Sequence, residues 1–165
     1  MGPVKELSES PNEIVRRTSA EIPDDVQRGI LAALENGKKD TIAENAMKII
    51  ERNIALAKEK SQPLCQDSGS VLFYVDCPVG FDQVTFEETA RSAVTEATKR
   101  GYLRQNSVDS LTGKNDGTNV GPGAPAFHFH QHRGEHVEVR LMLKGGGCEN
   151  VGAQYSLPNT PLKAN

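Results

Sequence analysis

The strand predicted from Ser70 to Val75 limits the fold of this chain more than any other segment, because its apolar run begins directly after a turn of small and polar residues at 63–70. The turn places a thiol, an amide and a carboxylate side by side, in Cys65, Gln66 and Asp67. Backbone geometry is tight where such a turn leads into a strand, and its side chains are directed at something rather than buried. We therefore expect a functional site at this junction.

Helical periodicity lies on both sides of this strand. Apolar residues at helical spacing predict helices at 24–36, 41–58 and 85–100, and a capping residue indicates a short helix at 12–19. We expect Asn12 to cap the first helix and Gly37 to end the second in the left-handed conformation. Thr-x-x-Glu capping boxes mark the starts of the third and fourth helices at Thr41 and Thr85. The third helix carries one broad apolar face, formed by Ile42, Ala46, Ile49, Ile50, Ile54 and Ala57.

The second half of the chain contains one long irregular segment and then two alternating ones. Residues 109–125 are rich in glycine and proline, and a loop of this length inside a compact domain is usually functional or packed against another segment. Residues 126–132 and 136–143 alternate strictly around a turn at 133–134, which predicts a C-terminal hairpin. With the strand at 70–75, these elements predict an α+β fold with helices packed on a small mixed or antiparallel sheet.

The length and composition indicate a soluble globular protein with either one good core or two small lobes, and they disfavour several classes of partner. A net charge of -3, with no Lys/Arg run among aromatic residues, disfavours nucleic acid. No apolar stretch approaches membrane-spanning length, and the first residues lack the apolar core of a signal peptide. Three cysteines, an odd number, suggest a reducing compartment, so we expect a cytoplasmic protein that meets no membrane.

Cys65 is either a metal ligand or a half-buried structural cysteine. The adjacent carboxylate of Asp67 disfavours a reactive thiolate, whereas a metal would supply the charge that holds one. Three thiolates can hold a cubic iron-sulfur cluster with one iron open as a Lewis acid, but Cys65, Cys77 and Cys148 lack ferredoxin spacing. Three glycines after Lys144 allow backbone to approach an anionic ligand closely, without the spacing of a P-loop.

Two further motifs have both a functional and a structural interpretation. His128, His130 and His132 lie on one face of a predicted strand, where they could share a zinc ion. Alternation alone requires polar residues on the solvent side of such a strand, so we favour solvent exposure. Arg104 follows a helix stop, where an arginine is usually a surface residue, although its guanidinium is well shaped to grip a carboxylate.

Three segments occur together in one order: Cys65-Gln66-Asp67-Ser68-Gly69, Leu103-Arg104-Gln105-Asn106-Ser107 and Lys144-Gly145-Gly146-Gly147-Cys148-Glu149-Asn150. Few protein families combine a Cys-Gln-Asp-(Ser/Thr)-Gly motif with a later Lys-Gly-Gly-Gly motif. Together these segments resemble the N-terminal part of the iron-sulfur hydro-lyases, the family of class I fumarate hydratases and of the alpha subunit of L-tartrate dehydratase. The similarity covers the chain from about Ile14 onward.

The resemblance implies a role for individual residues. It implies that Cys65 is one of three thiolate ligands of a [4Fe-4S] cluster whose fourth iron stays open for substrate. Gln66 and Asp67 would contact a small dicarboxylate, with Asp67 also taking part in proton transfer. Arg104 would pair with a substrate carboxylate, and the amide of Gly147 would line the same pocket. The implied reaction is reversible hydration of a small dicarboxylate, first of all fumarate to (S)-malate and alternatively tartrate to oxaloacetate.

The sequence departs from the family pattern at its cysteines. In the family the other two cluster ligands lie beyond the Lys-Gly-Gly-Gly motif, and the position of Cys148 is commonly a serine. We therefore expect neither Cys77 nor Cys148 to be a ligand. The family also needs a C-terminal domain or a separate beta subunit, which supplies further substrate residues and the catalytic base.

We expect residues 13–165 to be the N-terminal portion of an alpha-type catalytic domain, preceded by a flexible segment at 1–12. Alone, this portion would be inactive, and the full enzyme would be a homo-oligomer. The competing hypothesis is a binding domain that kept the fold and lost the chemistry. The joint presence of Cys65, Asp67 and Arg104 argues against it.

Overall fold

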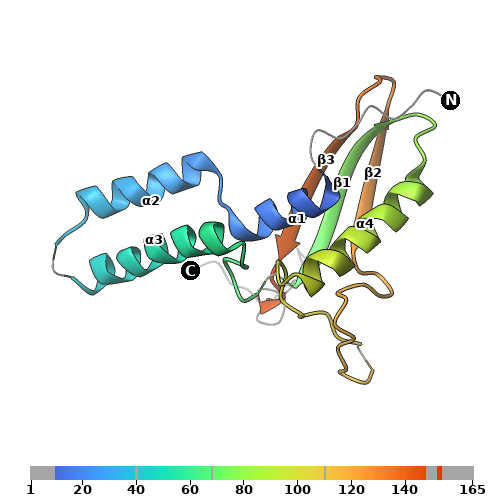
Figure 1. Ribbon diagram of the computed structural model, residues 1–165. Helices are drawn as coiled ribbons and strands as arrows, with labels where there is room; N and C mark the ends of the chain where they lie inside the picture. Colours follow the sequence, from blue (N-terminus) through green and yellow to red (C-terminus); the bar gives the residue numbers. More distant parts are fainter. Residues whose placement is uncertain (1–9, 40, 68, 110, 148–151, 154–165) are drawn as a thin grey trace, which may run out of the picture.

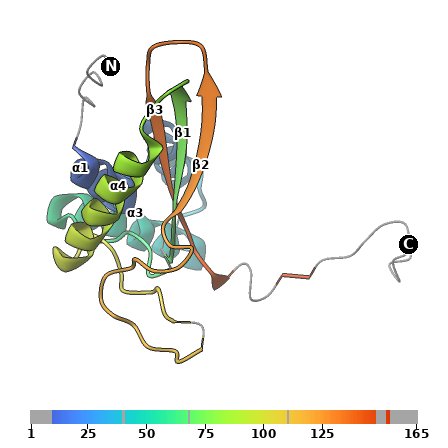
Figure 2. The ribbon, with the colours of Figure 1, turned by 90° about the vertical axis from the view of Figure 1, so that its right-hand side faces the viewer.

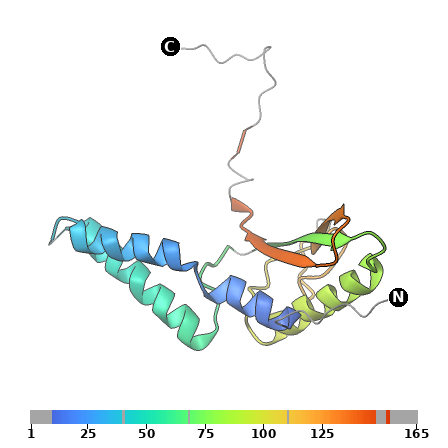
Figure 3. The same ribbon diagram turned by 90° about the horizontal axis from the view of Figure 1, so that it is seen from above.

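The computed structural model describes residues 10–39, 41–67, 69–109, 111–147 and 152–153. In chain order they form α1 (Pro11–Ala20), α2 (Asp24–Asn36), α3 (Ile42–Lys60), β1 (Ser70–Pro78), α4 (Gln83–Lys99), β2 (Ala126–His132) and β3 (Glu138–Lys144). Helices α2 and α3 form a hairpin that extends away from the rest (Figure 1 and Figure 3), while α1 and α4 lie on one face of a three-stranded sheet (Figure 2). The predicted α+β fold is confirmed. No helix among the described residues is long and apolar enough to cross a membrane.

The sheet has the order β2-β1-β3, so β1 is hydrogen-bonded along both edges. β1 runs parallel to β2 and antiparallel to β3, with Tyr74 opposite both His128 and Arg140. Both strands of the predicted C-terminal hairpin are present. The prediction that they pair with each other is wrong, because β1 lies between them. Alternation in the sequence predicts which face of a strand is buried, but it does not predict which strand lies next to it in the sheet. The connection at 133–137 crosses two strand spacings, about 10 Å, which five residues can span.

One face of β1 forms the centre of the core. Four side chains on this face are at most 4% exposed: Val71, Phe73, Val75 and Cys77. They cluster with four buried side chains of the two helices on that face, namely Val15, Ala90, Val94 and Ala97. The opposite face of β1 is in register with polar side chains of both neighbours, since Tyr74 lies opposite His128 and Arg140.

Helix α1 begins earlier than its sequence pattern predicts. The hydroxyl of Ser10 accepts a hydrogen bond from the N–H of Glu13 (3.3 Å), and proline suits the first helical position that Pro11 occupies. Asn12 is therefore inside the helix, and its prediction as the cap is wrong.

Helix α4 begins at Gln83 and not at Thr85. The Asp82 carboxylate accepts hydrogen bonds from the N–H (3.0 Å) and the hydroxyl (2.8 Å) of Thr85. These bonds lower the pKa of Asp82 from its ordinary value, because they favour the ionised form. An aspartate is a strong cap, so Thr85 lies in the first turn and its predicted role as the cap is wrong.

The connection between α2 and α3 follows the prediction at Thr41 and departs from it at Gly37. Oγ1 of Thr41 accepts a hydrogen bond from the N–H of Glu44 (3.2 Å), which confirms this cap. Gly37 has a φ of -72°, so it does not adopt the predicted left-handed conformation. The position still needs a glycine, because a Cβ there would lie 2.9 Å from the carbonyl oxygen of Ala33.

Truncating one buried valine of β1 tests this core. Val75 is 1% exposed, and Val75→Ala removes two methyl groups from a packed site, so we expect a loss of about 2 kcal/mol in the free energy of unfolding. Urea denaturation measures it. Val79→Ala is the matched control, since Val79 is 71% exposed and its loss should stay within about 0.5 kcal/mol. Equal losses in the two variants would contradict the assignment of the core.

Candidate functional site

The three motif segments meet at one end of the sheet. Ser70, the first residue of β1, is paired with Lys144, the last residue of β3, so the turns next to these residues are neighbours. Helix α4 returns the chain to this end before the parallel strand β2 begins (Figure 1). The prediction that the motif turns gather at one end of the sheet is confirmed.

The Asp67 carboxylate connects two of these turns. Its Oδ1 accepts a hydrogen bond from the N–H of Gly146 (3.0 Å), and its Oδ2 accepts one from the N–H of Gly147 (2.9 Å). A Cβ at Gly145 would lie 2.7 Å from both the carbonyl oxygen and the Oδ2 of Asp67, so a larger residue does not fit. The glycine turn that we expected to approach an anion thus approaches an anionic side chain of the same chain. Each carboxylate oxygen keeps a lone pair for a further donor.

Two asparagines hold the Arg104 segment against the same turn. Nδ2 of Asn106 donates a hydrogen bond to the carbonyl oxygen of Gln66 (2.8 Å). Nδ2 of Asn119 donates one to the carbonyl oxygen of Arg104 (2.7 Å). Both bonds use backbone acceptors, and Gln66 and Arg104 are themselves exposed. Their side chains are therefore accessible to a ligand at this end of the sheet.

Asn119 is a residue of this site that the sequence patterns did not single out. It is 3% exposed and has a positive φ of 55°. Its Oδ1 accepts a hydrogen bond from the N–H of Ser107 (3.1 Å), and its Nδ2 also donates to Oγ1 of Thr98 (3.1 Å). The loop at 109–125 is therefore packed against the site, as its length predicts. The available signal was an asparagine, which tolerates left-handed backbone, between glycines of that loop.

Cys65 lies in the turn that precedes β1 at this end of the sheet. It is exposed, and its Sγ accepts a hydrogen bond from the N–H of Asp67 (3.4 Å). The interpretation as a half-buried structural cysteine does not describe this residue. An accessible sulfur with an amide donor fits a ligand of an iron-sulfur cluster, because such hydrogen bonds support and tune cluster thiolates.

The other two cysteines do not complete a metal site with Cys65. Cys77 is fully buried near the far end of β1, about 23 Å along the strand from Ser70. Burial, followed by the charge of Asp76, raises the pKa of its thiol, which disfavours the thiolate that a ligand needs. Cys148 lies outside the described residues. Among those that are described, no three His, Cys, Asp or Glu side chains are grouped to hold a metal ion.

Each histidine of β2 contacts a different neighbouring side chain. The ring of His128 stacks on Tyr74, with centroids 4.8 Å apart. Nδ1 of His130 lies 3.1 Å from the carboxylate of Asp76. The ring of His132 stacks on that of His136, with centroids 4.5 Å apart. His128 and His130 are exposed, as the solvent-facing interpretation predicts. The zinc hypothesis gains no support from the part of the chain that the structure describes.

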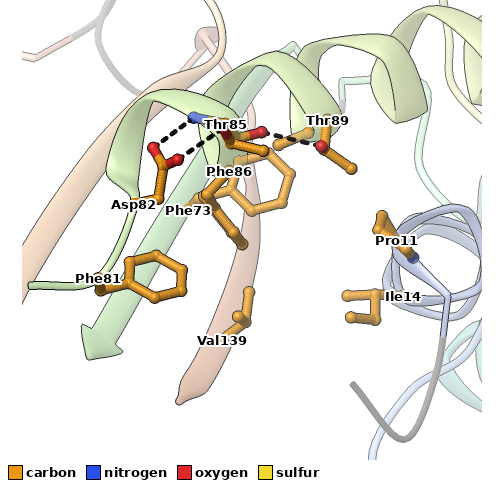
Figure 4. Close-up of a pocket in the computed structure, with 10 residues that line it drawn as sticks. Pro11, Ile14, Phe73, Phe81, Asp82, Thr85, Phe86, Thr89 and Val139 are labelled. Carbon is orange, nitrogen blue, oxygen red and sulfur yellow. Dashed lines mark hydrogen bonds between the residues drawn. The ribbon is translucent and has the colours of Figure 1, made fainter. Parts of the chain in front are cut away.

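A cavity of about 190 Å³ lies at the opposite end of the sheet (Figure 4). Its lining consists of Pro11, Ile14, Phe73, Phe81, Asp82, Thr85, Phe86, Thr89, Ala90 and Val139. The walls are mostly aromatic and aliphatic, and the one charged residue of the lining, Asp82, already bonds Thr85 as a helix cap. This cavity does not suit a charged ligand, so the motif end of the sheet is the candidate site.

The sequence of this chain matches a family of known proteins. Residues 8–164 match the family described as Fumarate hydratase (Fumerase). This chain belongs to the family of class I fumarate hydratases and L(+)-tartrate dehydratase alpha subunits. Over 155 residues it is 45% identical to "Putative fumarate hydratase class I" of Geobacillus stearothermophilus, a match that covers 94% of this chain and 30% of that protein.

Two relatives carry the name of the tartrate enzyme. "Putative L(+)-tartrate dehydratase subunit alpha" of Methanocaldococcus jannaschii is 29% identical over 152 residues, which cover 89% of this chain and 53% of that protein. "L(+)-tartrate dehydratase subunit alpha" of Escherichia coli (strain UTI89 / UPEC) is 28% identical over 151 residues, which cover 90% of this chain and 50% of that protein. This family member therefore spans about a third of the fumarate hydratase relative and about half of the two tartrate dehydratase relatives.

Substitution of two adjacent glycines tests the contact between the turns. Gly145→Ala would place a methyl group 2.7 Å from two oxygens of Asp67, so we expect a loss of about 1–3 kcal/mol in the free energy of unfolding. The amide NMR signals of Gly146 and Gly147 should shift as their bonds to Asp67 lengthen. Gly146→Ala is the control, since a Cβ there meets nothing within 4 Å and should change stability by less than about 0.5 kcal/mol. If both variants behave like wild type, the turns are not in close contact.

Proposed function

We propose that this chain is the N-terminal portion of the alpha-type catalytic domain of a [4Fe-4S]-dependent hydro-lyase that interconverts fumarate and (S)-malate. The observation that supports this most is the bond between Asp67 and Gly147, which lie 80 positions apart. The N–H of Asp67 also bonds Cys65, and Asn106, two positions after Arg104, bonds the neighbouring Gln66. Residues that the family motif assigns to substrate and cluster thus share one end of the sheet. The 45% identity to the fumarate hydratase relative supports fumarate as the first substrate to test.

The exposed side chains of Gln66 and Arg104 would bind the dicarboxylate. A guanidinium can donate two parallel hydrogen bonds to a carboxylate, and the exposure of Arg104 leaves its donors accessible. Gln66 adds a neutral donor and acceptor at the same end of the sheet. The two residues would orient the substrate over the turn that carries Cys65 and Asp67.

Asp67 would contact the substrate and take part in proton transfer. Its carboxylate is exposed, and the amides of Gly146 and Gly147 restrict its rotation. A fixed carboxylate with lone pairs still available can accept a proton or a hydroxyl donor from a substrate held beside it. In this proposal the amide of Gly147 acts on the substrate through Asp67, because Asp67 is its acceptor.

Cys65 would hold one iron of the cluster, and the amide of Asp67 would stabilise its thiolate. A bound [4Fe-4S] cluster supplies a Lewis acid that polarises the bond between carbon and the departing hydroxyl. The other two thiolate ligands would come from sequence beyond the Lys-Gly-Gly-Gly motif. Further substrate residues and the base would come from a second region, either a C-terminal domain or a beta subunit. The substrate would bind between that region and the exposed turns described here.

The second candidate is the alpha part of an L(+)-tartrate dehydratase. Two relatives with that name align with about nine tenths of this chain, at 29% and 28% identity. The complete protein, purified without oxygen together with its second region, should be assayed on fumarate, malate and tartrate. Turnover of tartrate alone would favour the second candidate. A protein that holds the cluster and turns over none of the three would support the binding-domain hypothesis.

Replacement of cysteines separates the cluster ligand from the core thiol. In the complete protein we expect Cys65→Ser to lose the cluster and Cys77→Ser to keep it, because Cys65 is exposed at the motif end whereas Cys77 is buried near the far end of β1. The 165-residue chain alone should bind no stoichiometric cluster, since one thiolate is too few. Iron counting and visible absorbance after anaerobic reconstitution measure both effects. A cluster on the chain alone that disappears in Cys77→Ser would contradict this assignment.

Substitutions of Arg104 and of Asp67 should change different kinetic constants, KM in the first case and kcat in the second. Arg104→Ala removes a charge-assisted contact with the substrate, worth about 1.5–3 kcal/mol, so KM should rise about ten- to a hundredfold. Asp67→Asn replaces one acceptor oxygen with an NH2 group, which removes the proton acceptor and one bond to the glycine turn. We expect kcat to fall roughly a hundredfold or more.

Steady-state kinetics with iron counted in each sample measures these effects, and Arg133→Ala is the control. Arg133 is exposed in the connection between β2 and β3, away from the motif end, so its loss should leave kcat and KM unchanged. A normal kcat for Asp67→Asn would leave Asp67 as a structural acid that holds the glycine turn. A normal KM for Arg104→Ala would remove Arg104 from the substrate site.

A further inference from the structure

Two asparagines of the loop at 109–125 hold the backbone that follows Arg104. Nδ2 of Asn119 donates a hydrogen bond to the carbonyl oxygen of Arg104 (2.7 Å), and its Oδ1 accepts one from the N–H of Ser107 (3.1 Å). Nδ2 of Asn115 donates one to the carbonyl oxygen of Gln105 (2.7 Å). The loop therefore bonds three backbone groups within four successive residues, and the first of these groups belongs to the arginine itself.

The backbone of Arg104 is also fixed by its neighbours in sequence. Leu103 is 4% exposed and belongs to the core cluster. The N–H of Asn106 donates to the carbonyl oxygen of Arg104 (3.0 Å), and its side chain bonds the carbonyl oxygen of Gln66 (2.8 Å). With the bond from Asn119, both lone pairs of the Arg104 carbonyl are used. The exposed side chain of Arg104 thus extends from a fixed backbone, and only its own torsions remain free.

Asparagine meets every requirement of position 119. The backbone there has a positive φ of 55°, which glycine, asparagine and aspartate adopt more readily than other residues. The side chain must accept a hydrogen bond from Ser107 and donate two, to Arg104 and to Oγ1 of Thr98 (3.1 Å). Glycine has no side chain and aspartate has no donor. Because Asn119 is 3% exposed, these bonds are shielded from water.

We propose that Asn119 is a positioning residue, which holds the backbone of Arg104 so that its guanidinium meets a carboxylate of the substrate. This inference rests on the proposed function, in which Arg104 binds the dicarboxylate. A binding group whose backbone is fixed beforehand loses less conformational freedom when the ligand binds. The loop at 109–125 therefore acts on substrate binding through Arg104.

Removal of the Asn119 side chain tests this role in the complete protein. Asn119→Gly deletes the amide and keeps a residue that adopts a positive φ. We expect KM for fumarate, or for tartrate if that is the substrate, to rise about tenfold, because the substrate must then order Arg104 itself. The value of kcat should change less than about twofold. Steady-state kinetics with iron counted in each sample measures both constants.

A double variant distinguishes positioning from a general effect on the fold. In the Arg104→Ala background, Asn119→Gly should raise KM no further, because the side chain that it positions is gone. Asn115→Ala provides a second test that leaves the buried amide intact. Asn115 is exposed and bonds only the next carbonyl, so we expect a rise in KM of about threefold, again absent in the Arg104→Ala background.

The matched control is Asn36→Gly. Nδ2 of Asn36 also donates to a backbone carbonyl, that of Ala32 (2.8 Å), but Asn36 ends α2, so its loss should leave kcat and KM unchanged. Circular dichroism checks the helix content of each variant. If Asn119→Gly does not fold, Asn115→Ala and its combination with Arg104→Ala give the same test.

Three results would overturn the proposal. Equal rises in KM with and without Arg104 would show that the loop only supports the fold. A raised KM for Arg104→Ala, with a normal KM for Asn119→Gly and Asn115→Ala, would overturn this inference and leave the proposed function intact. A normal KM for Arg104→Ala would overturn both this inference and the proposed contact between Arg104 and the substrate.

Discussion

The pairing of β1 along both of its edges is the constraint on which the rest of this structure depends. Because β2 is parallel to β1, helix α4 must carry the chain back to the start of β1 before β2 begins. Because β3 is antiparallel, it ends where β1 starts. The segments before β1, after α4 and after β3 therefore reach the same end of the sheet. The candidate site follows from this connectivity.

Once the segments are neighbours, Asp67 determines how closely they approach. A carboxylate that accepts hydrogen bonds from two successive glycine amides fixes the distance between its own turn and theirs. Gly145 permits that distance, since a Cβ would collide with Asp67. The same interaction gives Asp67 two roles in our proposals, one in the structure of the site and one in its chemistry. A neutral amide of similar shape would keep one of these two acceptor oxygens and lose the other.

Two surfaces of the described structure have unused binding capacity, and they differ in chemistry. The motif end exposes a thiol, an amide and a guanidinium, which suits a small anion and a metal cluster. The outer side of α3 exposes Ile42, Ile49 and Leu56, which suits another helix. The first surface needs a region that supplies more polar ligands, and the second needs an apolar partner.

The sequence by itself determined the elements and the residue types of the site. Local rules are sufficient for this, since periodicity at 24–36 and alternation at 126–132 depend on residues close in the chain. Glycine and polar motifs likewise marked the turns that carry Cys65 and Gly145. The caps predicted at Asn12 and Thr85 were wrong, because Ser10 and Asp82 nearby can also cap a helix and the free-energy differences between such capping residues are small.

Only the tertiary structure decided which strands pair and what the motif residues touch. Alternation assigns faces and not neighbours, so it could not show that β1 separates β2 from β3. The amides that Asp67 binds and the backbone that Asn119 holds are distant in sequence, and no local pattern encodes such contacts. They form because burial of one face of β1 brings the ends of the strands together.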